Sequence, residues 1–183
     1  NAPGDAQPGV GTLVAVGDRL DTGPGGGALL RVSGVGASQA SLRLAPDTHL
    51  VWQAPGRLQL LGGQVYLDTG LNGQGGGSVL AIEAAGARIE HVGTRFLVAL
   101  SGDVLDVKVR DGTVRIKAAG EVSLLESGEF GRLDRAGSGV PQIELQRVGI
   151  SGDDWSWVDA LAPALNIDEQ SLWSVLQRAA HEG

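Results

Sequence analysis

The stretch that decides the fold reads Ile89-Glu90-His91-Val92-Gly93-Thr94-Arg95-Phe96-Leu97-Val98, then Leu105-Asp106-Val107-Lys108-Val109, then Asp111-Gly112-Thr113-Val114-Arg115-Ile116. Apolar and polar side chains alternate over residues 105–109, which is the period of a strand with one buried face. A polar break lies at residues 101–103, and Asp111-Gly112 predicts a tight two-residue hairpin turn. Gly93, inside a strand-like run, predicts a bulge or a close approach of two backbones. The stretch therefore predicts β structure.

Short apolar runs separated by glycine-rich turns recur on both sides of this stretch. They lie at residues 12–16, 28–32, 41–44, 48–52, 57–61, 64–67, 79–84, 122–125, 130–133 and 143–148. This spacing favours a sandwich, a barrel or a solenoid over an α/β sheet. No strict repeat of fixed length is visible, so a solenoid would be irregular. We predict a mainly β fold, an irregular β-solenoid or a sandwich-like domain, with a short C-terminal helical segment.

The chain of 183 residues fits one domain with a small appendage. The expected divisions are a flexible lead-in over residues 1–11, the β domain over residues 12–148 and the helical segment over residues 149–183. The helical prediction rests on Asp168, a good N-cap residue, and on Leu172 and Leu176, which share one helical face.

Composition excludes several classes of protein. A net charge of −7 argues against nucleic-acid binding, which needs a basic surface. The absence of cysteine excludes a disulfide scaffold, a cysteine-ligated cluster and a cysteine nucleophile. No apolar run approaches the ~18 residues of a membrane span, and no signal peptide is present.

The chain lacks the motifs that carry catalysis or hold a cofactor. Its glycine runs have neither the lysine nor the strand-to-helix setting of a phosphate-binding loop. The three histidines, His49, His91 and His181, are not spaced for zinc. No serine sits in a nucleophile elbow. We therefore predict a protein that is not an enzyme, with no cofactor and no metal.

Tryptophans concentrate near the C-terminus, at Trp155, Trp157 and Trp173. One interpretation is that they anchor the helical segment on the β domain, because large aromatic side chains are usually buried. The other is a recognition surface, because indole rings are enriched at the centres of interfaces. In the second interpretation the partner surface comprises Trp155, Trp157, Leu165, Ile167 and Trp173.

The central stretch also carries a family resemblance. The residues concerned are Gly93-Thr94-Arg95-Phe96 with Val98, Val107 with Val109, and Gly112 with Val114. They resemble the core signature of the FecR family, the periplasmic sensor domains of bacterial regulators that control extracytoplasmic-function sigma factors. The segment from Asp154-Trp155 to Gly183 resembles the C-terminal portion of family members. That portion begins a small β-α-β module similar to the signalling domain of TonB-dependent outer-membrane transducers.

The resemblance implies a function in signal transduction. It implies the periplasmic ectodomain of a single-span inner-membrane protein, anchored through a segment absent from this chain. Its partner would be the signalling domain of a TonB-dependent transducer, as in iron-uptake signalling. The sigma factor would be contacted only by a cytoplasmic part, also absent here. The alternative function is a non-catalytic β module that binds cell-wall glycan or another envelope component.

Overall fold

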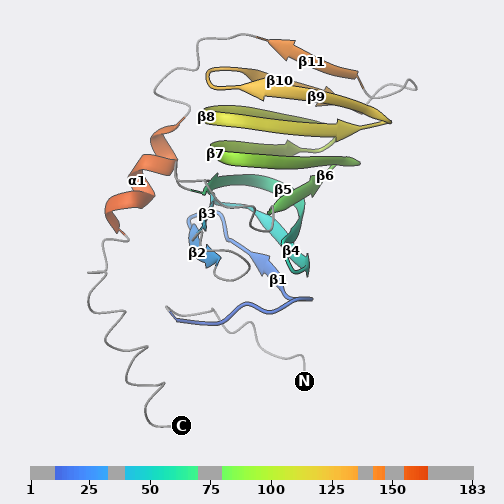
Figure 1. Ribbon diagram of the computed structural model, residues 1–183. Helices are drawn as coiled ribbons and strands as arrows, with labels where there is room; N and C mark the ends of the chain where they lie inside the picture. Colours follow the sequence, from blue (N-terminus) through green and yellow to red (C-terminus); the bar gives the residue numbers. More distant parts are fainter. Residues whose placement is uncertain (1–10, 33–39, 70–79, 136–141, 147–154, 165–183) are drawn as a thin grey trace.

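The computed structural model of the chain describes residues 11–32, 40–69, 80–135, 142–146 and 155–164. Within these ranges it contains an 11-stranded sheet and a single helix (Figure 1). The elements are β1 (Arg19–Asp21), β2 (Ala28–Val32), β3 (Ala40–Leu44), β4 (His49–Ala54), β5 (Arg57–Asp68), β6 (Ala81–Ala84), β7 (Ala87–Ser101), β8 (Val104–Ala118), β9 (Glu121–Glu126), β10 (Phe130–Asp134), β11 (Gln142–Gln146) and α1 (Ser156–Ala164). The predicted mainly β fold is confirmed.

Three long strands divide the sheet into two layers. The first half of β5 pairs with β4 and β6, and its second half pairs with β3 and β7. The first half of β8 pairs with β10 and the second half of β7, and its second half pairs with β9 and the first half of β7. The first layer thus ends at β1 and β9, and the second ends at β2 and β11. The arrangement is sandwich-like, with strands that turn a corner and continue in the other layer.

The core lies between the two layers. Along each strand, alternate apolar side chains point inward, so both layers contribute to one continuous cluster of buried residues. Its largest fully buried members include Phe96, Leu58, Ile82, Ile89 and Leu105. The core is built mainly from aliphatic side chains.

Glycines form the corners of the long strands. Gly63 in β5 has φ +89°, and Gly112 in β8 has φ +85°. A Cβ atom at Gly63 would lie 2.5 Å from the Thr48 Cα, and one at Gly112 would lie 2.5 Å from the Gly93 carbonyl oxygen. At both positions, therefore, the backbone conformation and the close approach of another chain segment require glycine.

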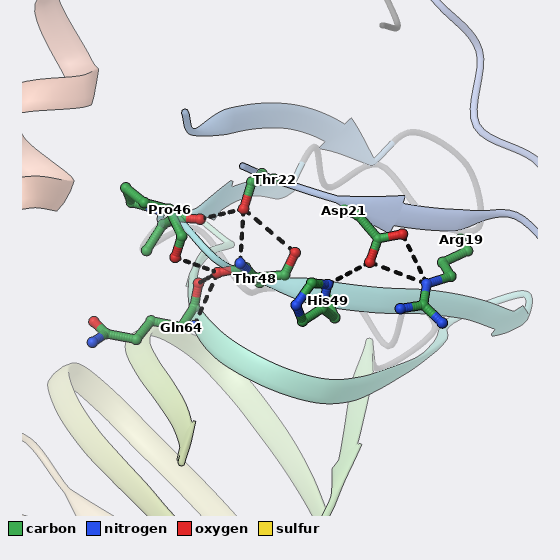
Figure 2. Close-up of polar contacts among 8 residues, drawn as sticks. Arg19, Asp21, Thr22, Pro46, Thr48, His49 and Gln64 are labelled. Carbon is green, nitrogen blue, oxygen red and sulfur yellow. Dashed lines mark hydrogen bonds and ion pairs between the residues drawn. The ribbon is translucent and has the colours of Figure 1, made fainter. Parts of the chain in front are cut away.

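A pair of threonines closes the first corner (Figure 2). The Thr22 backbone N–H donates to the Thr48 carbonyl at 2.9 Å. In return, the Thr48 N–H donates to the Thr22 hydroxyl at 2.8 Å. The Thr48 hydroxyl bonds with the backbone N–H and the carbonyl of Gln64, each at 3.1 Å. We call Thr22, Thr48 and Gly63 the first threonine clasp.

The second corner repeats this arrangement. The Thr69 N–H donates to the Thr94 carbonyl at 3.1 Å, and the Thr94 N–H donates to the Thr69 hydroxyl at 2.8 Å. Gly112 packs against Thr94 as Gly63 packs against Thr48. Thr69, Thr94 and Gly112 form the second threonine clasp. The string Leu-Asp-Thr-Gly occurs at both places, at residues 20–23 and 67–70, so the chain contains a loose internal repeat of unequal spacing.

The structure corrects three details predicted from the sequence. Residues 12–16 are not a strand, and Leu13 in this segment is 92% exposed. The predicted strands 57–61 and 64–67 form one continuous strand, β5. Asp111-Gly112 is not a hairpin turn: it lies inside β8, and the β7–β8 turn comes at Gly102-Asp103 instead. Gly112 uses its positive φ for the corner described above. The predicted bulge at Gly93 is confirmed by a register shift between Val92 and Arg95.

Among the residues that the structure describes, no helix is long and apolar enough to cross a membrane. The helix predicted to start at Asp168 lies outside the described residues.

Candidate functional site

The outer surface of the second layer carries the side chains that hold α1. Arg43 on β3 lies opposite Tyr66 on β5, and Tyr66 lies opposite Leu97 on β7. Directly opposed residues share one face of a sheet, so these side chains point the same way. Ala99 on β7 and Arg110 on β8 follow on the same face, two positions beyond Leu97 and Lys108. We call Arg43, Tyr66, Leu97, Ala99 and Arg110 the helix-docking face.

An aromatic contact forms the centre of this site. Trp155, immediately before α1, is 6% exposed, and Val158 on α1 is fully buried. The Trp155 ring meets the Tyr66 ring edge to face, with centroids 5.7 Å apart and planes at 72°. This is a favoured geometry for aromatic pairs. The contact joins the C-terminal segment to the β domain through an apolar cluster separate from the main core.

Two arginines hold the helix from either side. Arg110 makes two hydrogen bonds to the Asp159 carboxylate, at 2.9 and 3.4 Å, and its guanidinium lies 5.4 Å from the Trp155 ring centroid. Arg43 donates to the Val158 carbonyl at 3.3 Å and lies 5.5 Å from the Tyr66 ring centroid. Planar guanidinium groups combine paired hydrogen bonds with stacking on aromatic rings. Each arginine therefore links a polar group of α1 to an aromatic ring of the site.

Burial and charge alter the titration of this site. Burial raises the pKa of Tyr66, although a hydrogen bond with Arg110 opposes that effect. The hydrogen bond to Asp159 raises the pKa of Arg110. Both groups keep their ordinary neutral-pH forms, so the contact persists across the physiological range.

The docking contact leaves some hydrogen-bonding groups unused. The Arg43 Nε and the Trp157 Nε1 are both buried, and neither has a partner among the described residues. A buried donor without a partner costs free energy, about 1–3 kcal/mol. The contact between α1 and the sheet is therefore specific, but it leaves two buried donors without a hydrogen bond.

The structure describes two of the five residues predicted for a partner surface. Trp155 lies within the contact between α1 and the sheet, where the packing interpretation places it, and Trp157 on α1 is half-buried beside the same cluster. Leu165, Ile167 and Trp173 lie outside the described residues. The assignment of these five residues to partner binding stays a prediction.

The residues on the β side of this site were not among those predicted from the sequence. Tyr66 is the chain's single tyrosine and falls in a strand-like run, yet it is 1% exposed on the outer face of the sheet. A large aromatic residue on a face that alternation assigns to solvent indicates a covering element. That feature predicts that something packs there, although it does not identify α1.

Groups that could hold a metal do not gather in the part of the chain that the structure describes, since it contains no cluster of three or more His, Asp or Glu side chains. His49 and His91 lie on different strands, β4 and β7.

Comparison with protein-family models gives a match over residues 18–115, to the model described as FecR protein. This range runs from β1 into β8 and includes both threonine clasps. A comparison with curated protein sequences found no match.

Two solved structures share the fold, both of a candidate anti-sigma factor from Parabacteroides distasonis ATCC 8503. The first, at 1.65 Å resolution, has a TM-score of 0.58 and 13% identity and covers 70% of this chain. The second, at 2.50 Å, has a TM-score of 0.60 and 13% identity and covers 76% of this chain. The chain spans only 59% and 64% of the length of those two structures. At this identity the likeness is one of fold.

Proposed function

The chain belongs to the FecR family, and from that premise we propose that it is the signal-sensing part of a regulator of a sigma factor. In this proposal the chain lies in the periplasm and binds the signalling domain of a TonB-dependent outer-membrane transducer. The protein is non-catalytic, and its output is a change in the state of a partner. Iron-uptake signalling is the proposed setting.

The observation that carries the proposal is the docking of α1 on the β domain. The C-terminal segment follows the β domain and contacts it through Trp155, Val158 and Asp159. A partner that binds this segment would change the position of α1, and the arginines of the helix-docking face would transmit that change to β3 and β8. The contact thus gives a route from a partner at the C-terminal segment to the sheet.

The proposed partner surface contains Trp155, Trp157, Leu165, Ile167 and Trp173. Since Trp155 is 6% exposed, it acts by holding α1 in place rather than by direct contact. Trp157 is half-buried and therefore offers part of its ring to a partner. We expect Trp157→Ala to weaken binding directly and Trp155→Ala to weaken it by releasing α1.

Calorimetric titration with the isolated signalling domain of a TonB-dependent transducer tests the proposal. The transducer should be one encoded beside this chain. Saturable binding is expected, with a dissociation constant raised at least about tenfold by Trp157→Ala, since interface tryptophans often contribute more than 1.4 kcal/mol. Trp52→Ala is the matched control, because Trp52 is also half-buried but lies on β4, away from α1.

Three outcomes are informative. Loss of binding in Trp157→Ala but not in Trp52→Ala, with both variants folded at the temperature of the titration by circular dichroism, supports the proposal. Equal effects of the two substitutions contradict the assigned surface. No detectable binding to the signalling domain, together with retention of the chain on cell-wall glycan, would favour the alternative function, a glycan-binding module.

A further inference from the structure

Strand β9 forms one edge of the first layer and carries an exposed apolar pair. Val122 is 60% exposed and Leu124 is 53% exposed. Both point to the outer face, opposite Lys117 and Arg115 of β8. Among the described residues β9 pairs only with β8, so its other edge offers backbone N–H and carbonyl groups to a further strand.

The other edges whose side chains the structure describes are protected. The opposite edge of the first layer, β1, has three residues and carries Arg19 and Asp21. At the edge of the second layer, β2 carries an exposed arginine, Arg31, within its span. By contrast, β9 pairs regularly with β8 over all six of its residues and contains no Lys, Pro or Gly. Its charged residues, Glu121 and Glu126, stand only at its two ends, so the four residues between them lack the devices that usually block pairing at an edge.

The sequence of β9 is complementary to itself. In an antiparallel pair, directly opposed residues share a face. A two-fold axis through Ser123 would place Val122 of each copy opposite Leu124 of the other, so both apolar residues gain an apolar partner. A register centred on Leu124 would oppose Val122 to Glu126, and one centred on Val122 would leave Leu124 opposite the turn at Gly120. The Ser123 register alone pairs both apolar residues without opposing two like charges.

The surroundings of β9 suit this pairing. Lys117 and Arg115, which flank the apolar pair, are held by Glu90 at 2.9 and 3.9 Å. Glu90 offsets part of this positive charge, and Glu121 and Glu126 at the two ends of β9 add negative charge to the same edge, while the aliphatic stems of Lys117 and Arg115 extend the apolar surface.

We propose that β9 is a homodimerisation edge, at which β9 of a second copy of this chain pairs in antiparallel orientation about a two-fold axis at Ser123. The first layers of two molecules would then form one continuous sheet. A pair of six-residue strands buries less than the ~1,600 Å² of a standard interface, so the association is weak and reversible.

Sedimentation velocity of the whole chain over a wide concentration range tests the proposal. We expect a monomer–dimer equilibrium whose dissociation constant rises at least about tenfold with Leu124→Lys, because the new charge meets Val122 of the partner copy and lies beside Arg115. Val16→Lys is the matched control, since Val16 is 53% exposed but lies before β1, outside any strand. A chain that stays monomeric at every concentration, or a dimer equally tolerant of both substitutions, overturns the proposal.

Disulfide trapping tests the register. The chain contains no cysteine, so a single introduced cysteine reports on one position. Opposed Cα atoms of an antiparallel pair lie about 4.5–5.5 Å apart, within reach of a disulfide. Ser123→Cys should form covalent dimers under mild oxidation, whereas Ser101→Cys, exposed at the end of β7, should not. Equal yields from the two variants would contradict pairing at Ser123.

Discussion

In the first threonine clasp the hydroxyl of Thr48 faces the corner glycine, whereas in the second the methyl group of Thr94 faces it. The Thr48 Oγ1 lies 2.5 Å from the position of a Cβ on Gly63, and the Thr94 Cγ2 lies at the same distance from that position on Gly112. The backbone bonds between the threonine pairs are otherwise alike. The two clasps share the hydrogen bond to the hydroxyl of the first threonine, Thr22 or Thr69, but the hydroxyls of Thr48 and Thr94 differ in their hydrogen bonds.

A different hydroxyl replaces that of Thr94 in the second clasp. The Gly112 N–H donates to the Ser127 Oγ at 2.9 Å, while the Thr94 Oγ1 is buried without a partner among the described residues. In the first clasp, Thr48 itself satisfies the backbone of Gln64. The corner therefore needs a glycine and a hydrogen-bonded backbone, but the hydroxyl that bonds it can come from different segments of the chain, since Thr48 precedes β4 and Ser127 lies in the turn after β9.

The largest expected effect comes from filling the corners. Gly63→Ala and Gly112→Ala should each lower the free energy of unfolding by about 2–5 kcal/mol, because a left-handed conformation and an overpacked contact both add cost. Urea denaturation measures the change. Gly128→Ala is the control: Gly128 has φ +82° but nothing within 4 Å of a Cβ, so it isolates the conformational cost of about 1–2 kcal/mol. Equal losses at Gly112 and Gly128 would show that the corner contact is unimportant.

A smaller effect on the free energy of unfolding should appear at acid pH, and it should come from the histidine near the second clasp. Burial lowers the pKa of His91, close to the second clasp, to about 4, whereas His49, beside the first clasp, is 45% exposed and contacts Asp21. The unfolded chain takes up a proton near pH 6.5 and the folded chain does so only near pH 4. The His91 imidazole therefore leaves the free energy of unfolding unchanged above about pH 6.5. As the pH falls from about 6.5 to about 4 it lowers that free energy, by at most about 3 kcal/mol.

Replacing His91 by Phe should remove this part of the pH dependence. Urea denaturation at a series of pH values from neutral to about pH 4 measures it. A curve of the same slope in the variant and in the unaltered chain would contradict the assignment to His91 and assign the slope to the carboxylates.

The smallest expected effect is a difference in the free energy of unfolding between substitutions of Thr48 and of Thr94. Thr48→Val should destabilise the chain by about 1–3 kcal/mol, because the backbone N–H of Gln64 loses its acceptor, while the Gln64 carbonyl keeps its hydrogen bond from the Ala45 N–H. Thr94→Val should leave the free energy of unfolding unchanged or raise it slightly, because it removes a buried hydroxyl without a hydrogen bond. Thermal melting of both variants checks the contrast. A loss in Thr94→Val as large as that in Thr48→Val would reveal a hydrogen bond to the Thr94 hydroxyl.

Local patterns predicted most strands, because alternation and glycine turns are local properties. The hairpin turn predicted at Asp111-Gly112 was wrong because a positive φ occurs both in hairpin turns and at corners. Which of the two forms depends on the contact of Gly112 with Thr94, which is distant in sequence. The strand predicted at residues 12–16 was wrong for a different reason, since a short apolar run does not ensure a strand to pair with. The Leu-Asp-Thr-Gly string is visible twice in the sequence, but its meaning depends on the contacts of Thr22 and Thr69, which the structure shows.

The candidate site was predictable only on one side. Clustered tryptophans indicated that the C-terminal segment makes contacts, but the contacted residues depend on strand register. Tyr66, Leu97 and Arg110 converge because β5, β7 and β8 are aligned as they are. Alternation within β5 places Tyr66 on the outer face, but no local pattern fixes which residues of β7 and β8 lie beside it.

The corners of β5, β7 and β8 have a mechanical consequence. Sheets that merely stack can slide, since only side-chain packing resists shear between them. Here three unbroken backbones run from one layer into the other, so a sliding force would have to stretch covalent chain. A displacement applied through α1 on the second layer would therefore be carried by the whole body, as far as β9 at the rim of the first.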